Sequence, residues 1–302
     1  MWRNVIIREV PALLKSNARA RRGVEAAELI IDPPPPSSPS KNASSPSPSI
    51  SLWQTDVLSA AHRLTSPKPE TPHHHPKVAI LNMASPLRPG GGILQGSTGQ
   101  EEWICARTTL YASLREEFYR LPEVGAIYTP DVLVFRKWDE AATELPKKEW
   151  FYVDVVSAGM LRFPDLDQEE GEGEGEGRYA EEKDREMVVK KMRAVMRILR
   201  QKGVEKVVLG AWGVGAYGNP VGEVATAWKR VLVGKKGKGR EAWEGLEIVF
   251  AMKDGRTAER FAEEFGEGLV VEEFEGEGEE EEEDSEADEE EEKVLPRYGP
   301  GF

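Results

Sequence analysis

Residues 78–102 read VAILNMASPLRPGGGILQGSTGQEE, and this stretch decides the fold class. Its first part, Val78–Ala84, is an apolar run of strand length that contains β-branched side chains. A glycine-rich loop follows, and the sequence from Gln100 to Leu121 has a helical pattern. A buried strand that leads through such a loop into a helix is typical of α/β proteins, in which ligands bind at the carboxyl ends of the strands.

Strand and helix patterns alternate along the rest of the chain, which predicts a largely parallel or mixed sheet covered by helices on both faces. The expected helices cover 3–21, 55–64, 100–121, 179–201, 221–232 and 257–265, and Pro11 is a potential break in the first. The expected strands cover 78–84, 131–135, 150–156, 204–212 and 246–252.

Low-complexity segments divide the chain of 302 residues, because they have too few apolar side chains to enter a core. We predict one main α/β domain over 51–266, interrupted by a disordered connector at about 65–76 and an acidic Glu/Gly insert at about 167–178. The flanking segments are a helical extension that packs on this domain (1–32), a disordered Pro/Ser linker (33–50) and a disordered acidic tail (267–302).

The net charge of −14 conceals a basic body. Seven acids lie between Asp165 and Glu176, and 16 lie between Glu272 and Glu292, with no base in either stretch. The remaining residues carry 31 acids against 40 bases. Such a body attracts anionic ligands, although on charge alone we favour a solvated surface with solubilising tails.

The single cysteine, Cys105, excludes an intramolecular disulfide and fits a reducing compartment. We interpret it as a small buried side chain. No apolar run is long enough for a membrane span. The basic N-terminal stretch resembles a mitochondrial presequence in its arginine content, but we favour a helix of the folded domain because it contains Glu9 and few serines.

Two glycine loops are expected at the same sheet edge, where their backbone N–H groups could bind a diphosphate. The first contains Gly90–Gly92, and its spacing fits neither a Walker loop nor a dinucleotide fingerprint. The second, Gly213–Pro220, reads GVGAYGNP and places the aromatic ring of Tyr217 among glycines. Asn219 and Pro220 are typical of a helix cap and a first helical position.

Gln100, Glu101 and Glu102 open the helix after the first loop. Acids in a first turn also stabilise a helix through its dipole. Neighbouring residues on a helix point about 100° apart, so these two acids cannot form the facing carboxylate pair of ordinary glycosidases. One of them would transfer protons while the other binds substrate or solvent.

Taken together, these residues resemble the microbial-type poly(ADP-ribose) glycohydrolases, a branch of the macrodomain fold. That family has a GGG sequence, then six to eight residues, then QEE; here Gly90–Gly92, seven residues and Gln100–Glu102 match this pattern. LNMASPLRPGGG, RTTLYASL, YTPDVLVF and GAWGVGAYGNP also look like family sequence. The likeness extends over roughly 77–265 and implies a three-layer α/β/α macrodomain fold.

The resemblance also implies roles for the residues. Glu102 would be the general acid and then the base, Glu101 would bind the hydroxyls of the terminal ribose, and Asn82 would hold that ribose. Tyr217 occupies the position where the family has Phe, and it would shield the transition state. The remaining substrate-binding residues would be Gly90, Gly91, Gly92, Gln100, Gly213, Val214, Gly215, Ala216 and Gly218. The resemblance implies neither a metal nor a cofactor.

Two stretches depart from the family pattern. Val214 replaces a frequent Cys, and Ser157–Met160 lacks the expected Ala-rich, Pro-Asn-ending sequence, which leaves the adenosine contacts open. The cluster His73–His75 lies in a Pro-rich connector without nearby Cys, so we do not assign it a metal site.

The implied function is hydrolysis of the ribose–ribose bonds of poly(ADP-ribose) from the terminal end, in the nucleus or cytoplasm, within ADP-ribosylation reversal and the DNA damage response. The implied partners are the polymer and ADP-ribosylated proteins, and we expect a monomer without membrane attachment. A reader that binds ADP-ribose without cleaving it, and a mono-ADP-ribosyl hydrolase, remain alternatives. Sequence-specific nucleic-acid binding is not expected, because no RNP, helix-turn-helix or zinc motif is present.

Overall fold

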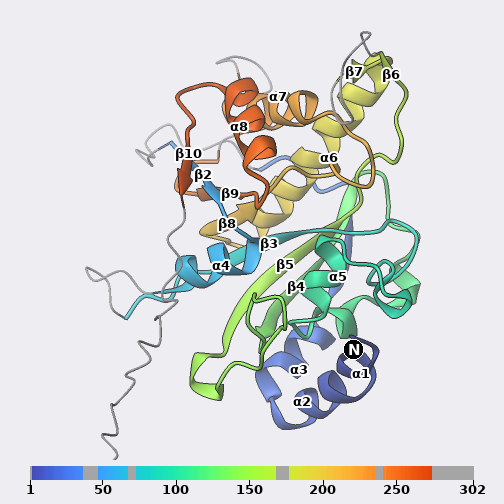
Figure 1. Ribbon diagram of the computed structural model, residues 1–302, viewed down its shortest axis with the longest axis vertical. Coiled ribbons are helices and arrows are strands. Elements are labelled where there is room, and N and C mark those ends of the chain that lie inside the picture. Colours follow the sequence, from blue (N-terminus) through green and yellow to red (C-terminus); the bar gives the residue numbers. More distant parts are fainter. Residues whose placement is uncertain are drawn as a thin grey trace, which may run out of the picture.

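The computed structural model describes residues 2–36, 47–66, 73–167, 177–234, 241 and 243–273. An eight-stranded sheet in the order β1-β4-β5-β3-β8-β9-β2-β10 crosses the molecule, with helices on both of its faces (Figure 1). The strands are β1 (Glu28–Ile31), β2 (Ser49–Gln54), β3 (Val78–Met83), β4 (Gly125–Val134), β5 (Phe151–Ala158), β8 (Lys206–Leu209), β9 (Glu247–Ala251) and β10 (Val271–Glu273). The predicted α/β class with three layers is confirmed.

Most of the sheet is parallel, and this brings several loops to one edge. β5, β3, β8, β9, β2 and β10 run parallel to one another, whereas β4 is antiparallel to both β5 and β1. β3 and β8 are adjacent, so the two glycine loops that follow them lie next to each other at the carboxyl edge.

The buried strand β3 shows why the sheet is covered on both faces. Ala79 and Leu81 belong to the core beneath α6 (Glu182–Gln201), α7 (Val221–Leu232) and α8 (Gly255–Phe265). The alternate residues Val78 and Ile80 belong to the opposite core, beneath α4 (Val57–Thr65) and α5 (Gln100–Cys105). Successive side chains of a strand point to opposite faces, so an apolar run without alternation fits a doubly covered strand.

The N-terminal helical region is present, although it is divided. α1 (Trp2–Asn4), a π-turn at Val5–Glu9 and α2 (Val10–Ser16) follow one another without a break, and Pro11 lies in the first turn of α2, directly after the π-turn. The break comes at Asn17, whose side chain accepts a hydrogen bond from the Ala20 N–H and caps α3 (Ala18–Glu25). This cap separates two helices that hydrophobic periodicity alone joins into one.

The expected helix 100–121 is wrong beyond Cys105. The chain there pairs with β4 instead, through a bridge between Thr108 and Val134, and continues in the short 3-10 turns Leu110–Ser113 and Glu116–Phe118. The Leu133 N–H donates to Thr109 Oγ1 at 3.0 Å. Threonine hydroxyls that bond backbone groups compete with helix hydrogen bonding, and the neighbouring strand decides the outcome here.

Three short strands lie in segments that were predicted to be the N-terminal extension, the Pro/Ser linker and the acidic tail. β1 lies within 1–32 and pairs with β4; β2 begins at Ser49, inside the predicted linker; and β10 lies within 267–302, paired with β2. The ordered fold therefore continues to Glu273. β6 (Leu166–Asp167) pairs with β7 (Arg178–Tyr179) at the two ends of the acidic insert. The central residues of the insert, 168–176, fall outside the described part, as do 37–46 of the linker, 67–72 of the connector and 274–302 of the tail.

Among the described residues no helix combines the length and apolar character needed to span a membrane.

Candidate active site

The first glycine loop closes around the carboxylate of Glu102. Its Oε1 atom accepts a hydrogen bond of 2.6 Å from the Gly92 N–H. A Cβ atom on Gly91 would overlap Oε1, and one on Gly99 would lie 2.7 Å from Oε2. The missing side chains at these glycines therefore leave the space that the Glu102 carboxylate occupies. The loop needs glycine at Gly91 for a second reason, because its φ of 57° lies in the left-handed region.

Glu101 lies behind Glu102 and is buried, with 3% of its surface exposed. Its carboxylate accepts hydrogen bonds from the Ser85 N–H at 2.8 Å and from Asn82 Nδ2 at 3.4 Å. Burial raises the pKa of Glu101 to about 8; the bonds from Ser85 and Asn82 oppose this shift, and the nearby Glu102 adds to it. Glu101 is thus held inside the protein and favours its neutral form.

Asn82 connects the end of β3 to this carboxylate. The side chain is fully buried, and Nδ2 also donates to Ser157 Oγ at 3.0 Å. Its Oδ1 atom is buried without a hydrogen-bond partner in the structure. An unpaired buried carbonyl is costly, so this oxygen is available to a donor that a ligand would bring.

Gln100 fixes the helix to the strand rather than facing open solvent. Its Oε1 accepts from the Met83 N–H at 2.9 Å and its Nε2 donates to the Leu81 carbonyl at 2.8 Å. These two bonds use backbone groups at the end of β3, and they set the position from which Glu101 and Glu102 project. Gln100 also lines the adjoining cavity.

The buried side chain of Asn219 holds the second loop in place. The prediction that Asn219 caps the following helix is wrong. α7 is preceded by Pro220, without a side-chain cap. Asn219 is fully buried; its Nδ2 donates to the carbonyls of Leu161 at 2.9 Å and Gly213 at 3.0 Å, and its Oδ1 accepts from the Tyr179 hydroxyl at 2.8 Å. The side chain therefore ties the two ends of the loop together. Its position before Pro220 suggested a helix cap instead.

Tyr217 brings the second loop to the first. Its hydroxyl is hydrogen-bonded to Ser85, and the Arg162 guanidinium lies 5.4 Å from its ring centre. Burial is the main reason why the pKa of Tyr217 is raised. Tyr119, which the sequence does not single out, contributes a buried hydroxyl without a partner, and its pKa is raised by burial and by the charge of Glu101. Aromatic side chains from two elements therefore enclose the region around Glu101.

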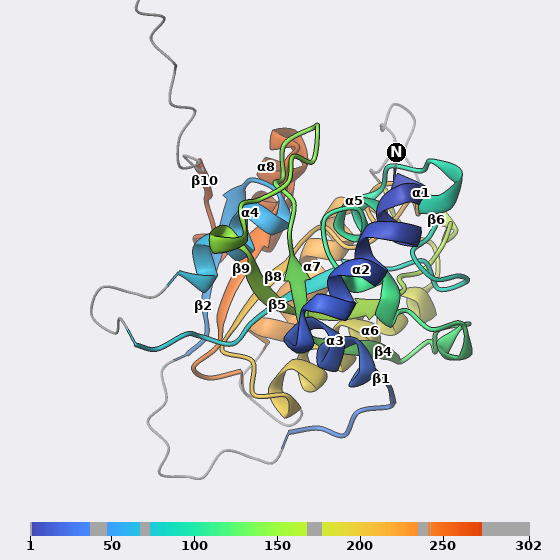
Figure 2. The same ribbon diagram turned by 90° about the horizontal axis from the view of Figure 1, so that it is seen from below.

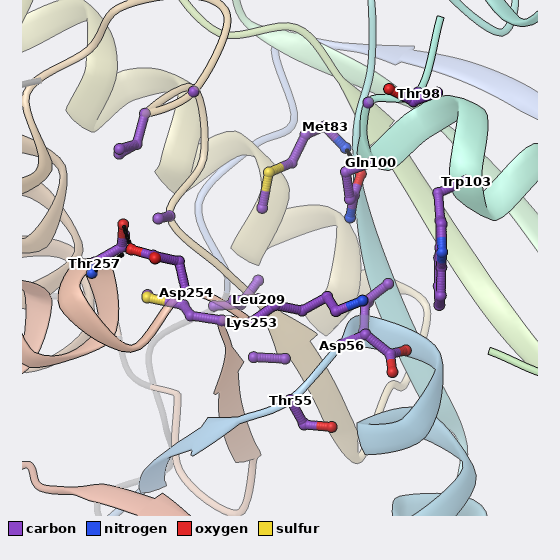
Figure 3. A pocket seen from close by; sticks show the side chains of 17 residues that line it. Thr55, Asp56, Met83, Thr98, Gln100, Trp103, Leu209, Lys253, Asp254 and Thr257 are labelled. Carbon is purple, nitrogen blue, oxygen red and sulfur yellow. Dashed lines mark hydrogen bonds between the residues drawn. The ribbon is translucent and has the colours of Figure 1, made fainter. Parts of the chain in front are cut away.

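A cavity of about 520 Å³ opens between the two loops, and Gln100, the neighbour of the acidic pair, lines it (Figure 3). Gly99 and Gln100 line one side, and Val214 and Gly215 line another. The segments after β2 and β9 complete it, as described next, and Glu101, Glu102 and Asn82 do not line it. The structure thus brings both glycine loops to one cavity and places the acidic pair beside it.

Sequence reasoning missed Asp56, Trp103 and Lys253 in this cavity. Lys253 extends across it (Figure 3), and its Nζ lies 6.0 Å from the Trp103 ring centre. It forms no ion pair within the described ranges. Asp56 accepts hydrogen bonds from the N–H groups of Leu58 and Ser59 and so caps α4. Asp56 follows β2 and Lys253 follows β9, and both strands belong to the parallel part of the sheet. Knowledge of the strand order would therefore have placed both residues at this edge.

A model of the catalytic domain of microbial-type poly(ADP-ribose) glycohydrolases matches residues 16–137. The structure is similar to that of the poly(ADP-ribose) glycohydrolase from Thermomonospora curvata, with 26% identity, a TM-score of 0.65, and coverage of 87% of this chain and 99% of that one. The chain is thus similar to the microbial-type poly(ADP-ribose) glycohydrolases in residues 16–137 and in its fold. The enzyme from Deinococcus radiodurans in complex with ADP-ribose shares the fold, with 22% identity, a TM-score of 0.60, and coverage of 81% and 96%. No curated protein sequence matches the chain.

The glycohydrolase model covers the first loop and both acids, whereas the second loop lies beyond its matched residues. The similarity to the Thermomonospora structure spans most of both chains and so includes the sheet that carries the two loops. The altered stretch Ser157–Met160 is built into the core of this glycohydrolase fold, since Ser157 bonds Asn82 and Met160 is buried against Gly213.

The described ranges contain no cluster of three His, Cys, Asp or Glu side chains arranged to hold a metal ion. His74 of the predicted connector instead contacts Glu205, with 2.8 Å between Nε2 and Oε2. Cys105 is fully buried against apolar side chains, and burial raises its pKa well above the ordinary value. A buried thiol of this kind is unreactive.

Proposed function

We propose that this protein is a poly(ADP-ribose) glycohydrolase that hydrolyses the ribose–ribose O-glycosidic bonds of ADP-ribose polymers. The observation that carries this proposal is the Glu102 carboxylate, which is enclosed by Gly91, Gly92 and Gly99 and fixed through one oxygen. A carboxylate held in this way beside a cavity is positioned for proton transfer to a bound substrate.

Glu102 supplies both proton transfers in this mechanism. As an acid it donates a proton to the oxygen of the leaving ribose while the glycosidic bond breaks. As a carboxylate it then removes a proton from water, which attacks the anomeric carbon of the terminal ribose and restores the acid. Oε1 accepts from Gly92, so Oε2 is the atom that exchanges protons with substrate and water.

Glu101 and Asn82 bind the terminal ribose rather than transfer protons. Glu101 is buried and bonded to Ser85 and Asn82, which supports a role in holding hydroxyl groups. The unpaired Asn82 Oδ1 can accept a further bond from such a hydroxyl. Tyr217, at the junction of the loops, covers this ribose and shields the developing positive charge of the transition state.

The diphosphate lies between the loops, against the backbone of Gly90–Gly92 and of Gly213–Gly218, with Val214 and Ala216 at its edge. We assign the adenosine end to the cavity of about 520 Å³, where Asp56 supplies a carboxylate and Lys253 a positive charge. The diphosphate also stabilises the positive charge that develops on the ribose, which makes a second carboxylate acting on the reacting carbon unnecessary.

The polymer is cleaved from its terminal end, because a closed site around the ribose suits a chain terminus. The physiological partners under this proposal are ADP-ribosylated proteins, and the setting is the reversal of ADP-ribosylation within the DNA damage response, in the nucleus or cytoplasm, by a monomeric enzyme.

The test is release of free ADP-ribose from auto-modified polymerase by wild type, Glu102→Gln and, as a matched control, Glu116→Gln. Glu116 is exposed on a nearby turn, and its substitution leaves the site intact. We expect release to fall by about 10²- to 10⁴-fold in Glu102→Gln, with ADP-ribose binding by calorimetry retained, and no change in Glu116→Gln.

Binding without release by wild type would contradict the proposal and favour an ADP-ribose reader. Release only from a defined mono-modified protein would favour a mono-ADP-ribosyl hydrolase.

A further inference from the structure

The N-terminal helices present a basic face that the proposed reaction does not use. Their exposed bases are Arg3, Arg8, Lys15, Arg19, Arg21 and Arg22. Of these, Arg3, Arg8, Lys15 and Arg22 form no ion pair within the described ranges. These helices contain two acids: Glu9 is bonded to the buried Arg136, and Glu25, at the end of α3, forms no ion pair with these bases within the described ranges. The face therefore carries positive charge that the described protein does not compensate.

This face is rigidly attached to the body of the enzyme. Asn17 Nδ2 donates to the Tyr152 hydroxyl at 2.8 Å, and Arg19 pairs with Asp131 at 2.7 Å. Arg115 donates to the carbonyls at the end of α3, including that of Glu25 at 2.9 Å. Because the bases project from a fixed platform, an anionic partner loses little entropy in ordering the protein when it binds.

The basic face begins beside the catalytic loop. α1 packs against the turn Ile93–Gln95, which joins Gly92 to Gly99 around the Glu102 carboxylate. The Arg107 guanidinium lies 5.6 Å from the Trp2 ring centre. From there α1, α2 and α3 follow one another along one side of the molecule (Figure 2). With a rise of about 1.5 Å per residue, the helices up to Ser16 extend roughly 20 Å from the loop.

We propose that this face binds the part of the ADP-ribose polymer that lies beyond the scissile bond. The inference rests on the proposed function, in which the terminal unit occupies the cavity and the bond to the next unit lies at Glu102. The remaining polymer must leave past the loop that encloses this carboxylate, and α1 is packed on that loop. Each further unit has a diphosphate, so regularly spaced anions meet the bases at Arg8, Lys15 and Arg22.

A nucleic acid would satisfy the same charges, but the position of the face favours the polymer. A substrate chain whose end is already bound at Glu102 is held near the bases, so a few charge contacts raise its affinity through high effective concentration. A separate nucleic acid gains no such advantage, and four unpaired bases are few for stable binding at physiological salt.

The experiment uses the full chain with the triple substitution Arg8→Gln, Lys15→Gln and Arg22→Gln. The matched control removes three bases from α6, away from the N-terminal helices: Lys183→Gln, Lys190→Gln and Arg193→Gln. KM and kcat are measured for long polymer and for the shortest cleavable substrate, two linked ADP-ribose units, across a salt series.

We expect KM for long polymer to rise roughly tenfold at low salt in the triple variant, and the slope of log KM against log salt to fall by about 2, close to 0.7 per lost phosphate contact. KM for the two-unit substrate and kcat for both substrates should stay at the wild-type values, and the control should match wild type.

A triple variant that matches the control on long polymer would overturn the proposal. An equal loss on both substrates would also overturn it, because the effect would then lie in the active site.

Duplex DNA that binds wild type more tightly than polymer does, with this preference lost in the triple variant, would assign the face to nucleic acid. If removal of 274–302 abolished the difference between wild type and the triple variant, the acidic segment would be the occupant. Failure of wild type to release ADP-ribose from the two-unit substrate would instead refute the proposed function.

Discussion

The two glycine loops look alike in sequence but differ in what their glycines make room for. In the first loop, a Cβ on Gly90 would lie 2.6 Å from the Tyr111 ring, and a Cβ on Gly91 would overlap the Glu102 carboxylate. In the second loop, Gly213 is crowded by Met160, whereas a Cβ on Gly215 or Gly218 would meet no heavy atom within 4 Å. The first loop is therefore filled by the protein itself, and the second is open on the side of the cavity.

Gly215 makes this contrast sharpest. It is exposed, its φ lies outside the left-handed region, and a Cβ atom there would meet no heavy atom within 4 Å in the free protein. Neither the backbone conformation nor the packing in the free protein explains why residue 215 is a glycine. A residue of this kind is best explained by a ligand that approaches the backbone closely. The first loop thus positions catalytic groups, and the second leaves surface for the substrate.

The largest effect is expected from Gly91→Ala. The new methyl group displaces the Glu102 carboxylate, and it also crowds Glu101, whose Oε2 would lie 2.9 Å away. Misplacement of a catalytic group by about 1 Å costs on the order of 10²-fold in rate, so kcat for ADP-ribose release should fall by at least that factor.

Gly96→Ala is the matched control for this substitution. Gly96 lies in the same loop and also has a positive φ, 88°, but a Cβ there meets nothing within 4 Å. It should show the modest stability loss of a strained backbone, about 1 kcal/mol, with kcat unchanged. Equal losses of kcat in the two variants would show that loop strain, rather than displacement of the carboxylates, causes the effect.

The buried Glu101 makes stability depend on pH. Its pKa is raised to about 8 in the folded protein from an ordinary value of 4.5, so between these values the folded state binds more protons than the unfolded state. Stability contributed by this group is present below pH 4.5 and is lost as the pH rises through 8. At about 1.4 kcal/mol per pKa unit, the full loss is of the order of 5 kcal/mol.

Glu101→Gln removes this titration while keeping the shape of the side chain. We expect the free energy of unfolding, measured by denaturant titration, to decline less between pH 5 and pH 8 in the variant than in wild type. Identical declines would mean that Glu101 is already ionised at pH 5 and that the first loop holds a charge, not a neutral acid.

The core of the fold was predictable because its signals are local. Val78–Met83 is apolar at every position but Asn82, and α6, α7 and α8 follow the helical period, so both element types and the covered sheet follow from the chain. The edge strands β1, β2 and β10 were missed because three to six residues with mixed burial have little pattern of their own. The partner strand determines their conformation.

The candidate site divides in the same way. The spacing of Gly90–Gly92 and Gln100–Glu102 is readable in the sequence, and adjacency of the loops follows from the parallel order of β3 and β8. The contribution of Lys253 depends on the strand order, which places β9 beside β8 and which no local pattern contains. Asn219 was misassigned because an Asn directly before a helix can either cap that helix or, when buried, hydrogen-bond the backbone of the preceding loop.

Asn219→Ala tests whether the open second loop is preorganised before it meets ligand. Removal of this side chain leaves the Tyr179 hydroxyl and the Leu161 carbonyl without the partner that they have now. Buried groups left unpaired cost about 1–3 kcal/mol, so the melting temperature should fall, and ADP-ribose should bind more weakly because the loop must be ordered on binding.

Tyr179→Phe is the control for Asn219→Ala, since it removes only the bond from the hydroxyl and leaves both loop ties in place. It should lower stability less and leave ADP-ribose affinity unchanged. A loss of affinity equal to that of Asn219→Ala would mean that the loop ties through Nδ2 are not what shapes the second loop.

Gly215→Ala should give the smallest effect and the cleanest separation between the loops. The free protein accepts this methyl group without contact, and an alanine in place of glycine outside the left-handed region stabilises by up to about 1 kcal/mol by restricting the unfolded chain. The melting temperature should therefore stay the same or rise. If the substrate backbone contact is close, calorimetry should show ADP-ribose affinity reduced by about tenfold, or about 1.4 kcal/mol, and reduced further in Gly215→Val. Gly215→Ala should thus leave the folded protein intact and weaken only ligand binding. Gly91→Ala should instead displace the carboxylates of the site before any ligand binds. Full affinity in Gly215→Val would show that the open side of the second loop does not face the ligand.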